Sequence, residues 1–201
     1  MRIGLVNFKG GVAKTTSSIY LAAAACVRDL EVTVHDLDPH AEATKWARIS
    51  RQLGHPLPFP VLAANGETLE DLADDRKLHI LDAAPSGPGL ESAIAHADLV
   101  IVPTSESAAD VQQTWMALDT LKSRGVPAWV LMCRAEPRTR SFREAIGALD
   151  SRGVPRFDTV IGKSQALKHG PAVDLGIGAS RSPRLAGYGQ VLAELGEEGL
   201  L

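Results

Sequence analysis

The chain is predicted to be one α/β domain over residues 1–201, with a mostly parallel, twisted sheet covered by helices on both faces. Short apolar runs rich in Val, Ile and Leu alternate with amphipathic stretches along its length, which is typical of such a sheet. A length of 201 residues suits one domain with a two-sided core. Its 45% hydrophobic and 22% charged content is ordinary for a globular protein.

The strands are predicted from continuous apolar runs, because a strand buried on both faces shows little alternation. Several of these runs end in Asp, Asn or Pro, residues that favour turns. The predicted strands are Ile3–Asn7, Val32–Asp36, His79–Asp82, Leu99–Pro103, Ala128–Cys133 and Thr159–Ile161.

The helices are predicted from the amphipathic stretches between these runs. Ser107 and Asp110 predict an altered capping box at the start of the fifth helix. Three glycines predict a mobile loop over Gly170–Pro183. The predicted helices are Thr15–Asp29, Ala41–Leu53, Leu69–Arg76, Leu90–Ala97, Ala108–Arg124, Ser141–Arg152 and Ser182–Leu195.

A phosphate-binding loop joins the first strand to the first helix. The run F-K-G-G-V-A-K-T-T spans positions 8–16, and Lys14 and Thr15 fill the places of the lysine that contacts phosphates and the hydroxyl that binds Mg²⁺. The strand, loop and helix order is the context that this motif requires. The sequence therefore predicts a P-loop NTPase fold with a phosphate site at a helix N-terminus.

The loop departs from the ordinary motif in a specific way. Phe8 and Ala13 stand where glycines are required, and a second lysine, Lys9, precedes the glycine pair. The pattern x-K-G-G-x-x-K-[ST] should arise by chance in roughly one in a few thousand chains of this length. The extra lysine distinguishes this loop from one that only binds a nucleotide.

Carboxylates follow two of the predicted strands. Asp36 and Asp38 close the second strand, and would point toward the loop if the strands are neighbours. Asp82 ends the apolar run at positions 79–82, which has the form of a Walker B element that holds Mg²⁺ through water. Together with the loop, these carboxylates predict a site of nucleotide hydrolysis.

Charge, cysteines and hydropathy narrow the possible functions. A net charge of −3 does not indicate a nucleic-acid binder, so DNA contact would need a local basic patch. Cys26 and Cys133 show no metal or redox spacing and are expected to be free thiols in a reducing cytoplasm. No apolar run approaches the length of a membrane span.

These motifs resemble the ParA/MinD group of deviant-Walker P-loop ATPases, and most closely the small ParA-type partition ATPases without an N-terminal DNA-reading domain. The resemblance covers nearly the whole chain. Three departures are His40 for glutamine, Ala84 for proline, and Cys133-Arg134 where the family often has asparagine-arginine near the base. The matching segments are Asp36–Pro39 with Trp46 and Arg48, Ala84–Ser86, Ala97–Pro103, and Tyr188–Leu195.

The resemblance implies that ATP and Mg²⁺ are the cofactors and that ATP joins two subunits face to face. Lys9, Lys14 and Asp38 would be catalytic, with Lys9 reaching the partner's phosphates and Asp38 orienting the attacking water. Thr15 would bind Mg²⁺, with Asp36 and Asp82 in its outer shell. The phosphate-binding residues would be Lys9, Gly10, Gly11, Val12, Ala13, Lys14, Thr15 and Thr16.

The resemblance also implies partners. The ATP-bound homodimer would bind nonspecific DNA in the cytoplasm, associate with the nucleoid, and be released when a ParB-like, centromere-binding adaptor stimulates slow hydrolysis. The function expected is partition of plasmid or chromosomal DNA. The basic residues available for DNA contact are Arg134, Arg138, Arg140, Arg143, Arg152, Arg156, Lys163 and Lys168.

Other functions remain as alternatives. A ParA-like ATPase could position a non-DNA cargo, such as an organelle or a conjugative or chemosensory complex, because the partner selects the cargo. A MinD-like membrane cycle is disfavoured, because the segment Glu194–Leu201 is acidic and broken by glycines rather than basic and amphipathic. A redox ATPase is also disfavoured, because it would need cysteines placed for an iron–sulfur cluster and Cys26 lies inside the predicted helix after the loop. A ligase of the dethiobiotin-synthetase type is disfavoured by Lys9 and the D-x-D-P run.

Overall fold

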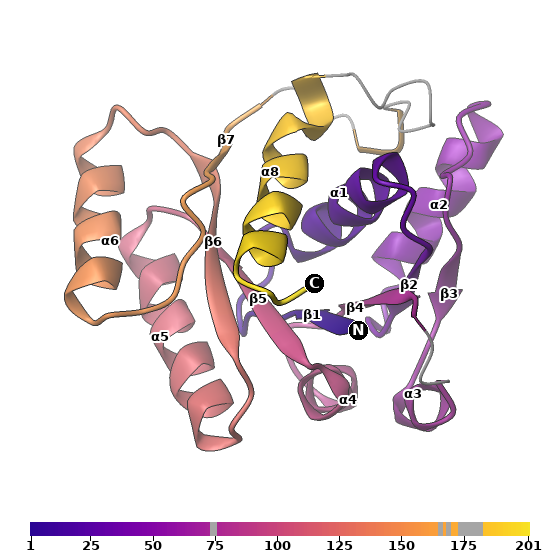
Figure 1. The fold of residues 1–201 in the computed structure, drawn as a ribbon, viewed down its shortest axis with the longest axis horizontal. Helices are drawn as coiled ribbons and strands as arrows, with labels where there is room; N and C mark the ends of the chain where they lie inside the picture. The colour runs from indigo at the N-terminus through magenta and orange to yellow at the C-terminus, as the bar shows by residue number, and fades with distance from the viewer. Residues whose placement is uncertain (73–75, 165–166, 168–169, 173–182) are drawn as a thin grey trace.

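The computed structural model describes the whole chain except residues 73–75, 165–166, 168–169 and 173–182. Its centre is a seven-stranded sheet in the order β3-β2-β4-β1-β5-β6-β7, and all of the pairings are parallel (Figure 1). The strands are β1 Arg2–Leu5, β2 Val32–Asp36, β3 Val61–Ala63, β4 Leu78–Asp82, β5 Leu99–Thr104, β6 Ala128–Ala135 and β7 Ile161–Gly162.

Helices cover both faces of this sheet, as predicted. One face carries α1 (Lys14–Val27), α2 (Glu42–Gln52) and α8 (Pro183–Glu197), and α8 packs directly on α1 (Figure 1). The other face carries α3, α4, α5 and α6. Their bounds are α3 Gly66–Glu70, α4 Pro88–His96, α5 Ala108–Ser123 and α6 Arg140–Ser151.

Each face has its own hydrophobic core, because side chains of a strand point alternately to the two faces. The core under α1 and α8 contains the stacked rings of Tyr20 and Tyr188, whose centroids lie 5.5 Å apart. The core under α4 and α5 contains Val100 and Val102 of β5 and Leu121 of α5. No helix within the described residues has the length and apolar character needed to cross a membrane.

Three sequence-based expectations on the fold were wrong in detail. The helix predicted over Leu69–Arg76 lies earlier, over Gly66–Glu70, because Asn65 and Thr68 cap each other's backbone amides and start it there. The edge strand Val61–Ala63 was missed because it is three residues long and its Leu62 is exposed. The last strand lies over Ile161–Gly162 rather than Thr159–Ile161.

The mobile loop predicted over Gly170–Pro183 falls largely outside the described residues. Its described beginning, Gly170–Ala172, is a short 3-10 turn. The other helices and strands agree with the predicted ones to within a few residues.

A buried histidine pair joins two central strands. His35 of β2 and His79 of β4 lie with Nε2 and Nδ1 3.0 Å apart on the α4 side of the sheet, and both residues are buried. Burial lowers the pKa of His35 from 6.5 to about 4, with further lowering by the electrostatic interactions with His79 and Arg2. The folded protein therefore holds His35 neutral.

This histidine should make stability depend on pH. The unfolded chain binds a proton below about pH 6.5, whereas folded His35 binds one only near pH 4. The free energy of unfolding is therefore unaffected by this group above pH 6.5. It falls by about 3 kcal/mol in all as the pH decreases from 6.5 to 4, because the unfolded chain then binds a proton that folded His35 does not. We expect His35→Gln, which does not titrate, to remove this loss in urea unfolding between pH 7.5 and 4.5.

The measured quantity is the difference between His35→Gln and the wild type, because other groups titrate in the same range. His40→Gln, at an exposed histidine, is the control and should keep the wild-type pH dependence. An identical pH dependence in His35→Gln and wild type would contradict the assignment.

Candidate active site

The phosphate-binding loop connects the end of β1 to the first turn of α1. Gly11 and Ala13 both have a φ of 76°, in the left-handed region, and Ala13 is the residue before the helix. A left-handed alanine is strained, which explains why glycine is usual at this position. No side chain caps α1, so its first amides face the pocket. This helix N-terminus can therefore bind an anion.

Lys14 lies under the loop. The side chain is largely buried, and Nζ donates to the carbonyl of Lys9 at 2.9 Å. Burial lowers the pKa of Lys14, opposed by the negative charges of Asp82, Asp38 and Glu42. Its ammonium group therefore lies beneath the loop where phosphate would be held.

Asp82 lies at the centre of the carboxyl edge of the sheet. It pairs in register with Leu5 on one side and Asp36 on the other, because β4 lies between β1 and β2. Ser18 donates to Oδ1 at 2.9 Å, whereas Oδ2 is buried without a hydrogen-bond partner. Burial raises the pKa of Asp82 to about 7, opposed by hydrogen bonds from Thr15 and Ser18.

The carboxylate of Asp36 stabilises the loop that follows β2 through hydrogen bonds. Its Oδ2 accepts from the amide and hydroxyl of Thr44 at 2.8 and 2.7 Å, and its Oδ1 accepts from the amide of Asp38 at 3.2 Å. It thereby caps α2, whose own first residues supply no cap. Its expected place in the outer shell of Mg²⁺ stays a prediction.

Asp38 lines the pocket together with the loop. The amide of His40 donates to Asp38 Oδ1 at 2.8 Å, which fixes the orientation of the carboxylate. Asp38, His40 and Lys14 all line the same pocket. The structure therefore brings the predicted water-orienting carboxylate to the phosphate-binding loop.

Lys9 points away from this pocket. Its Nζ forms an ion pair with Asp110 in the first turn of α5, and Ser105 donates to the other oxygen of Asp110 at 2.5 Å. Burial would raise the pKa of Asp110, but the hydrogen bonds from Lys9 and Ser105 bring it below its usual value. The capping box predicted from Ser107 was half right: Ser107 caps the amide of Asp110, whereas the carboxylate of Asp110 binds Lys9.

The pocket between these elements has a volume of about 460 Å³. The sequence did not indicate that Arg134 would reach the loop, where its Nη1 donates to the carbonyl of Gly11 at 2.7 Å. Arg134 has a φ of 54° beside a bulge in β6, which aims its side chain at the loop. The far wall consists of Cys133, Arg134, Ile161, Gly162, Lys163, Ser164, Leu167 and Tyr188.

The residues present fit ATP with Mg²⁺. Asp82 has one oxygen without a hydrogen-bond partner and interacts with the hydroxyl of Thr15, and nothing lies within 4 Å of a Cβ added at Gly10 or Gly11. Among the described residues, no three His, Cys, Asp or Glu side chains form a site that could hold a metal. Mg²⁺ commonly keeps waters and takes phosphate oxygens as ligands, so one hydroxyl and one nearby carboxylate suit it.

The predicted basic patch is mostly engaged within the protein. Arg140, Arg156 and Lys163 form ion pairs with Glu144, Asp150 and Glu136. Arg152 lies over the ring of Trp115 at 4.2 Å, and Arg134 binds the loop. Lys168 lies outside the described residues. Within the described part of the chain, the side chains of Arg138 and Arg143 have neither an ion pair nor a contact of these other kinds.

Comparisons with known proteins agree on one family. The family model of the CobQ/CobB/MinD/ParA nucleotide-binding domain matches residues 3–177. The chain is 30% identical to the Maintenance of carboxysome distribution protein A of Gloeobacter kilaueensis, over 96% of this chain and 93% of that protein. It is 38% identical to the chromosome-partitioning ATPase Soj of Thermus thermophilus over 48% of this chain and 37% of that protein.

Solved structures agree on the fold. The septum site-determining protein MinD from Pyrococcus horikoshii, complexed with Mg-ADP, superposes with a TM-score of 0.80 at 16% identity, covering 98% of this chain and 96% of that one. An identity this low supports the fold and not the cargo or partner.

The loop that carries Asp38 is packed against the start of α4. A Cβ added at Gly89 would lie 2.1 Å from the carbonyl oxygen of Leu37, a backbone atom. The amide of Leu37 in turn donates to the carbonyl of Asp82 at 3.0 Å. Only glycine lets α4 approach the Asp38 loop this closely.

We expect Gly89→Ala to displace the Asp38 loop and to lower the free energy of unfolding by about 2 kcal/mol, since overpacking against backbone forces the neighbours apart. Urea unfolding and nucleotide binding should both show the loss. Gly147→Ala is the control, because its added Cβ meets nothing within 4 Å inside α6. Wild-type stability and nucleotide affinity in Gly89→Ala would contradict the contact.

Proposed function

The chain belongs to the CobQ/CobB/MinD/ParA nucleotide-binding domain family and is an ATPase of the ParA/MinD type that uses ATP and Mg²⁺, and we propose that it acts as an ATP-driven dimer switch that positions a cargo. In this proposal the ATP-bound homodimer holds nonspecific DNA, and a partner protein stimulates hydrolysis to release it.

One observation carries the dimer proposal: Lys9 belongs to the loop but does not line its pocket. Its side chain is 40% exposed and lies on Asp110, while Lys14 alone of the two lysines lies beneath the loop. A loop lysine directed away from its own pocket is available to a second chain that approaches this edge of the sheet. We infer that the complete active site needs Lys9 from a partner.

The remaining residues have separate roles in hydrolysis. Lys14 and the loop amides would hold the phosphates and neutralise their charge. Thr15 and Asp82 would hold Mg²⁺, which neutralises charge on the phosphate oxygens when bound. Asp38, fixed by the amide of His40, would orient the attacking water. Lys9 of the second chain would offset the charge that develops during transfer, as an arginine finger does.

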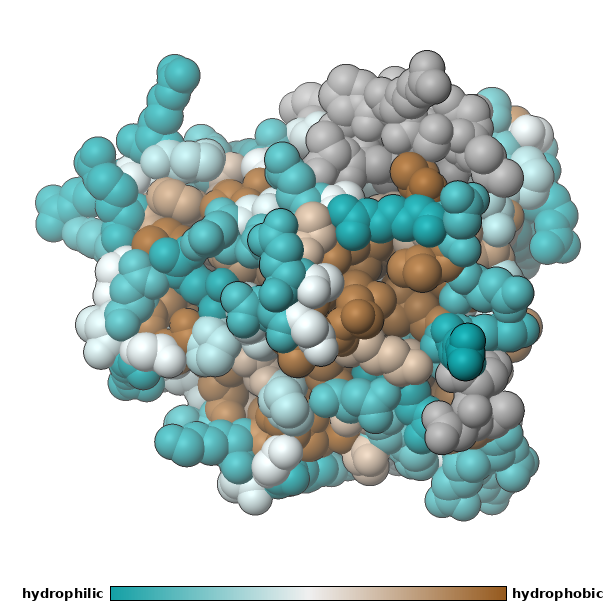
Figure 2. Space-filling view, viewed as in Figure 1, coloured by the Kyte–Doolittle hydropathy of each residue, from teal (hydrophilic) through white to brown (hydrophobic). Residues whose placement is uncertain are grey.

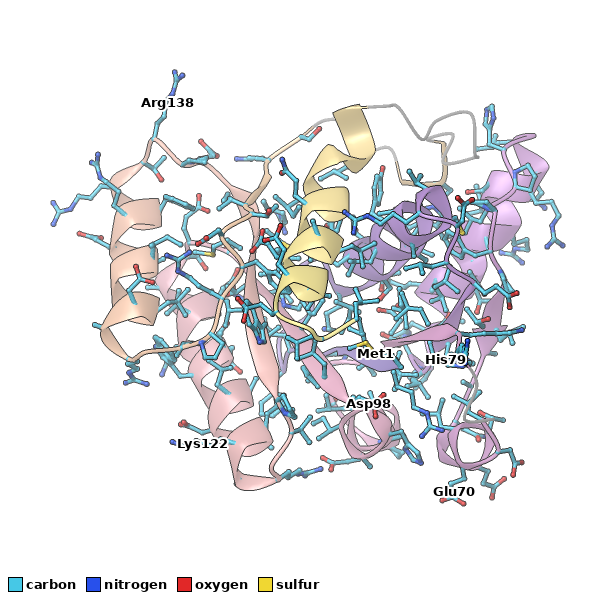
Figure 3. The ribbon with its side chains drawn as sticks, viewed as in Figure 1. Met1, Glu70, His79, Asp98, Lys122 and Arg138 are labelled. Carbon is cyan, nitrogen blue, oxygen red and sulfur yellow. The ribbon has the colours of Figure 1, made fainter. Side chains whose placement is uncertain are left out.

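The proposed DNA contact rests on Arg138 and Arg143. Arg138 lies in the turn just before α6 and Arg143 lies in the first turns of that helix, and Arg138 extends away from the body of the protein (Figure 3). The surface at the left of Figure 2, where α6 lies, is hydrophilic to intermediate in hydropathy. Because the net charge is −3, any such contact would be local, electrostatic and sensitive to salt.

Two cargoes are candidates. DNA partition is supported by the similarity to Soj, which covers 48% of this chain. A protein-shelled organelle is supported by the similarity to the carboxysome distribution protein, which covers 96% of it. The longer match favours the second cargo. Proteins captured with the ATP-locked chain from its own cells would decide between a centromere-binding adaptor and an organelle-associated one.

Lys9→Ala and Asp38→Ala should separate the two steps of the switch. Without Lys9 the chain should retain ATP binding through Lys14 but lose hydrolysis and ATP-linked dimerisation. Without Asp38 it should bind ATP and remain dimeric, because only the water is mispositioned. Light scattering with ATP measures the dimer, and phosphate release measures turnover. Turnover should fall at least tenfold in both variants, whereas the dimer should be lost only in Lys9→Ala.

Lys122→Ala, at a solvent-facing lysine near the end of α5, is the control and should behave as wild type (Figure 3). Unchanged phosphate release in Lys9→Ala would refute the role across the dimer. A monomeric Asp38→Ala protein at saturating ATP would refute the role of Asp38.

Retention on nonspecific DNA should require ATP and should weaken steeply with salt. The double variant Arg138→Ala, Arg143→Ala removes four cations per dimer, so the slope of log affinity against log salt should decrease by roughly 3 to 4. Fluorescence anisotropy at several salt concentrations measures this slope. Arg48→Ala with Arg51→Ala removes the same charge from α2 and should leave it unchanged; equal retention without ATP would contradict the switch.

A further inference from the structure

Asp110 is built into a rigid network at the carboxyl end of β5. Its carboxylate accepts from Ser105 at 2.5 Å, and its backbone carbonyl accepts from the hydroxyl of Thr114 at 2.9 Å. The hydroxyl of Thr114 also forms a hydrogen bond with the hydroxyl of Thr104 at 2.8 Å. These three hydrogen bonds join residues of β5, the loop that follows it and α5. Ser105 thus orients the carboxylate of Asp110 independently of Lys9.

Lys9 is the less constrained member of the pair. Its amide is bound by the side chain of Asn7 at 3.0 Å, but its side chain is 40% exposed compared with 12% for Asp110. The ion pair with Asp110 is the contact that directs the ammonium group along its own chain. A long lysine side chain in this position can adopt another direction once that contact is broken.

We propose that Asp110 is a positioning residue that retains Lys9 on its own chain and thereby sets the protein concentration at which two ATP-bound chains join. The proposal rests on the proposed function, because it needs Lys9 to act across the dimer. The two positions of Lys9 exclude each other: an ammonium group bound to Asp110 cannot also reach a partner's phosphates. Every dimer that forms must therefore break two Lys9–Asp110 pairs.

This symmetry determines the size of the effect. A partly exposed ion pair changes an equilibrium by roughly two- to fivefold. Because two pairs break per dimer, the factor enters squared, and the dimer dissociation constant should respond by roughly 4- to 25-fold. Removal of Asp110 should therefore favour the dimer, whereas removal of most residues at an active site disfavours it.

The test uses the full chain with Asp110→Asn, which keeps the size of the side chain and removes its charge. Asp119→Asn is the matched control, because it removes the same charge from an exposed position on the same helix. In the absence of nucleotide, amine labelling of Lys9, followed by mass spectrometry, should be several times faster in Asp110→Asn than in wild type or control. With ATP, light scattering should show the dimer at a 4- to 25-fold lower protein concentration.

A second variant protects the test against a folding defect in Asp110→Asn. Ser105→Ala removes the hydrogen bond that orients Asp110 but keeps the charge, so it should shift labelling and dimerisation in the same direction by a smaller factor. Unfolding in urea verifies that each variant is folded.

The outcomes separate the two proposals. Unchanged labelling of Lys9 in both variants would overturn the retention by Asp110. Faster labelling with an unchanged or weakened dimer would overturn its control of dimerisation. If wild type forms no dimer at any ATP concentration, the proposed function fails and the control of dimerisation fails with it, while faster labelling would still establish the ion pair.

Discussion

The active site depends on the insertion of β4 between β1 and β2. This pairing sets Leu5, Asp82 and Asp36 at one level of the sheet, so that the phosphate-binding loop and both acidic strand ends leave it at the same edge. Parallel strands make this possible, since their carboxyl ends all meet there. Asp82 is placed in the middle of this edge and is enclosed by α1, where Ser18 satisfies one of its oxygens.

The cations of the site are held by groups of their own chain. Lys14 donates to the carbonyl of Lys9, Arg134 donates to the carbonyl of Gly11, and Lys9 pairs with Asp110. The carbonyl oxygens of the loop therefore accept hydrogen bonds from the cationic groups that would otherwise bind phosphate oxygens. In the proposed function, nucleotide binding would exchange these contacts for charge-assisted ones to phosphate, which would couple the conformation of the loop to the presence of the nucleotide.

Local backbone strain accompanies this arrangement. Ala13 and Arg134 both adopt left-handed conformations that glycine would adopt at lower cost, and both border the loop. Strained residues persist where the surrounding structure fixes them, and they commonly cluster at functional sites. Here Ala13 begins α1 and Arg134 directs a guanidinium to Gly11, so each strained residue places a group that faces the pocket.

The sequence alone determined the fold class, the phosphate-binding loop and the acidic residues around it, because hydrophobic runs and a nine-residue motif are local properties. It missed the edge strand at Val61 and misplaced the helix near Leu69, where short elements depend on single capping contacts. Tertiary structure decided which residues meet. Arg134 lies 123 positions from Gly11, and Asp110 lies 101 positions from Lys9. No spacing in the chain encodes those contacts; the strand order brings them together at one edge of the sheet.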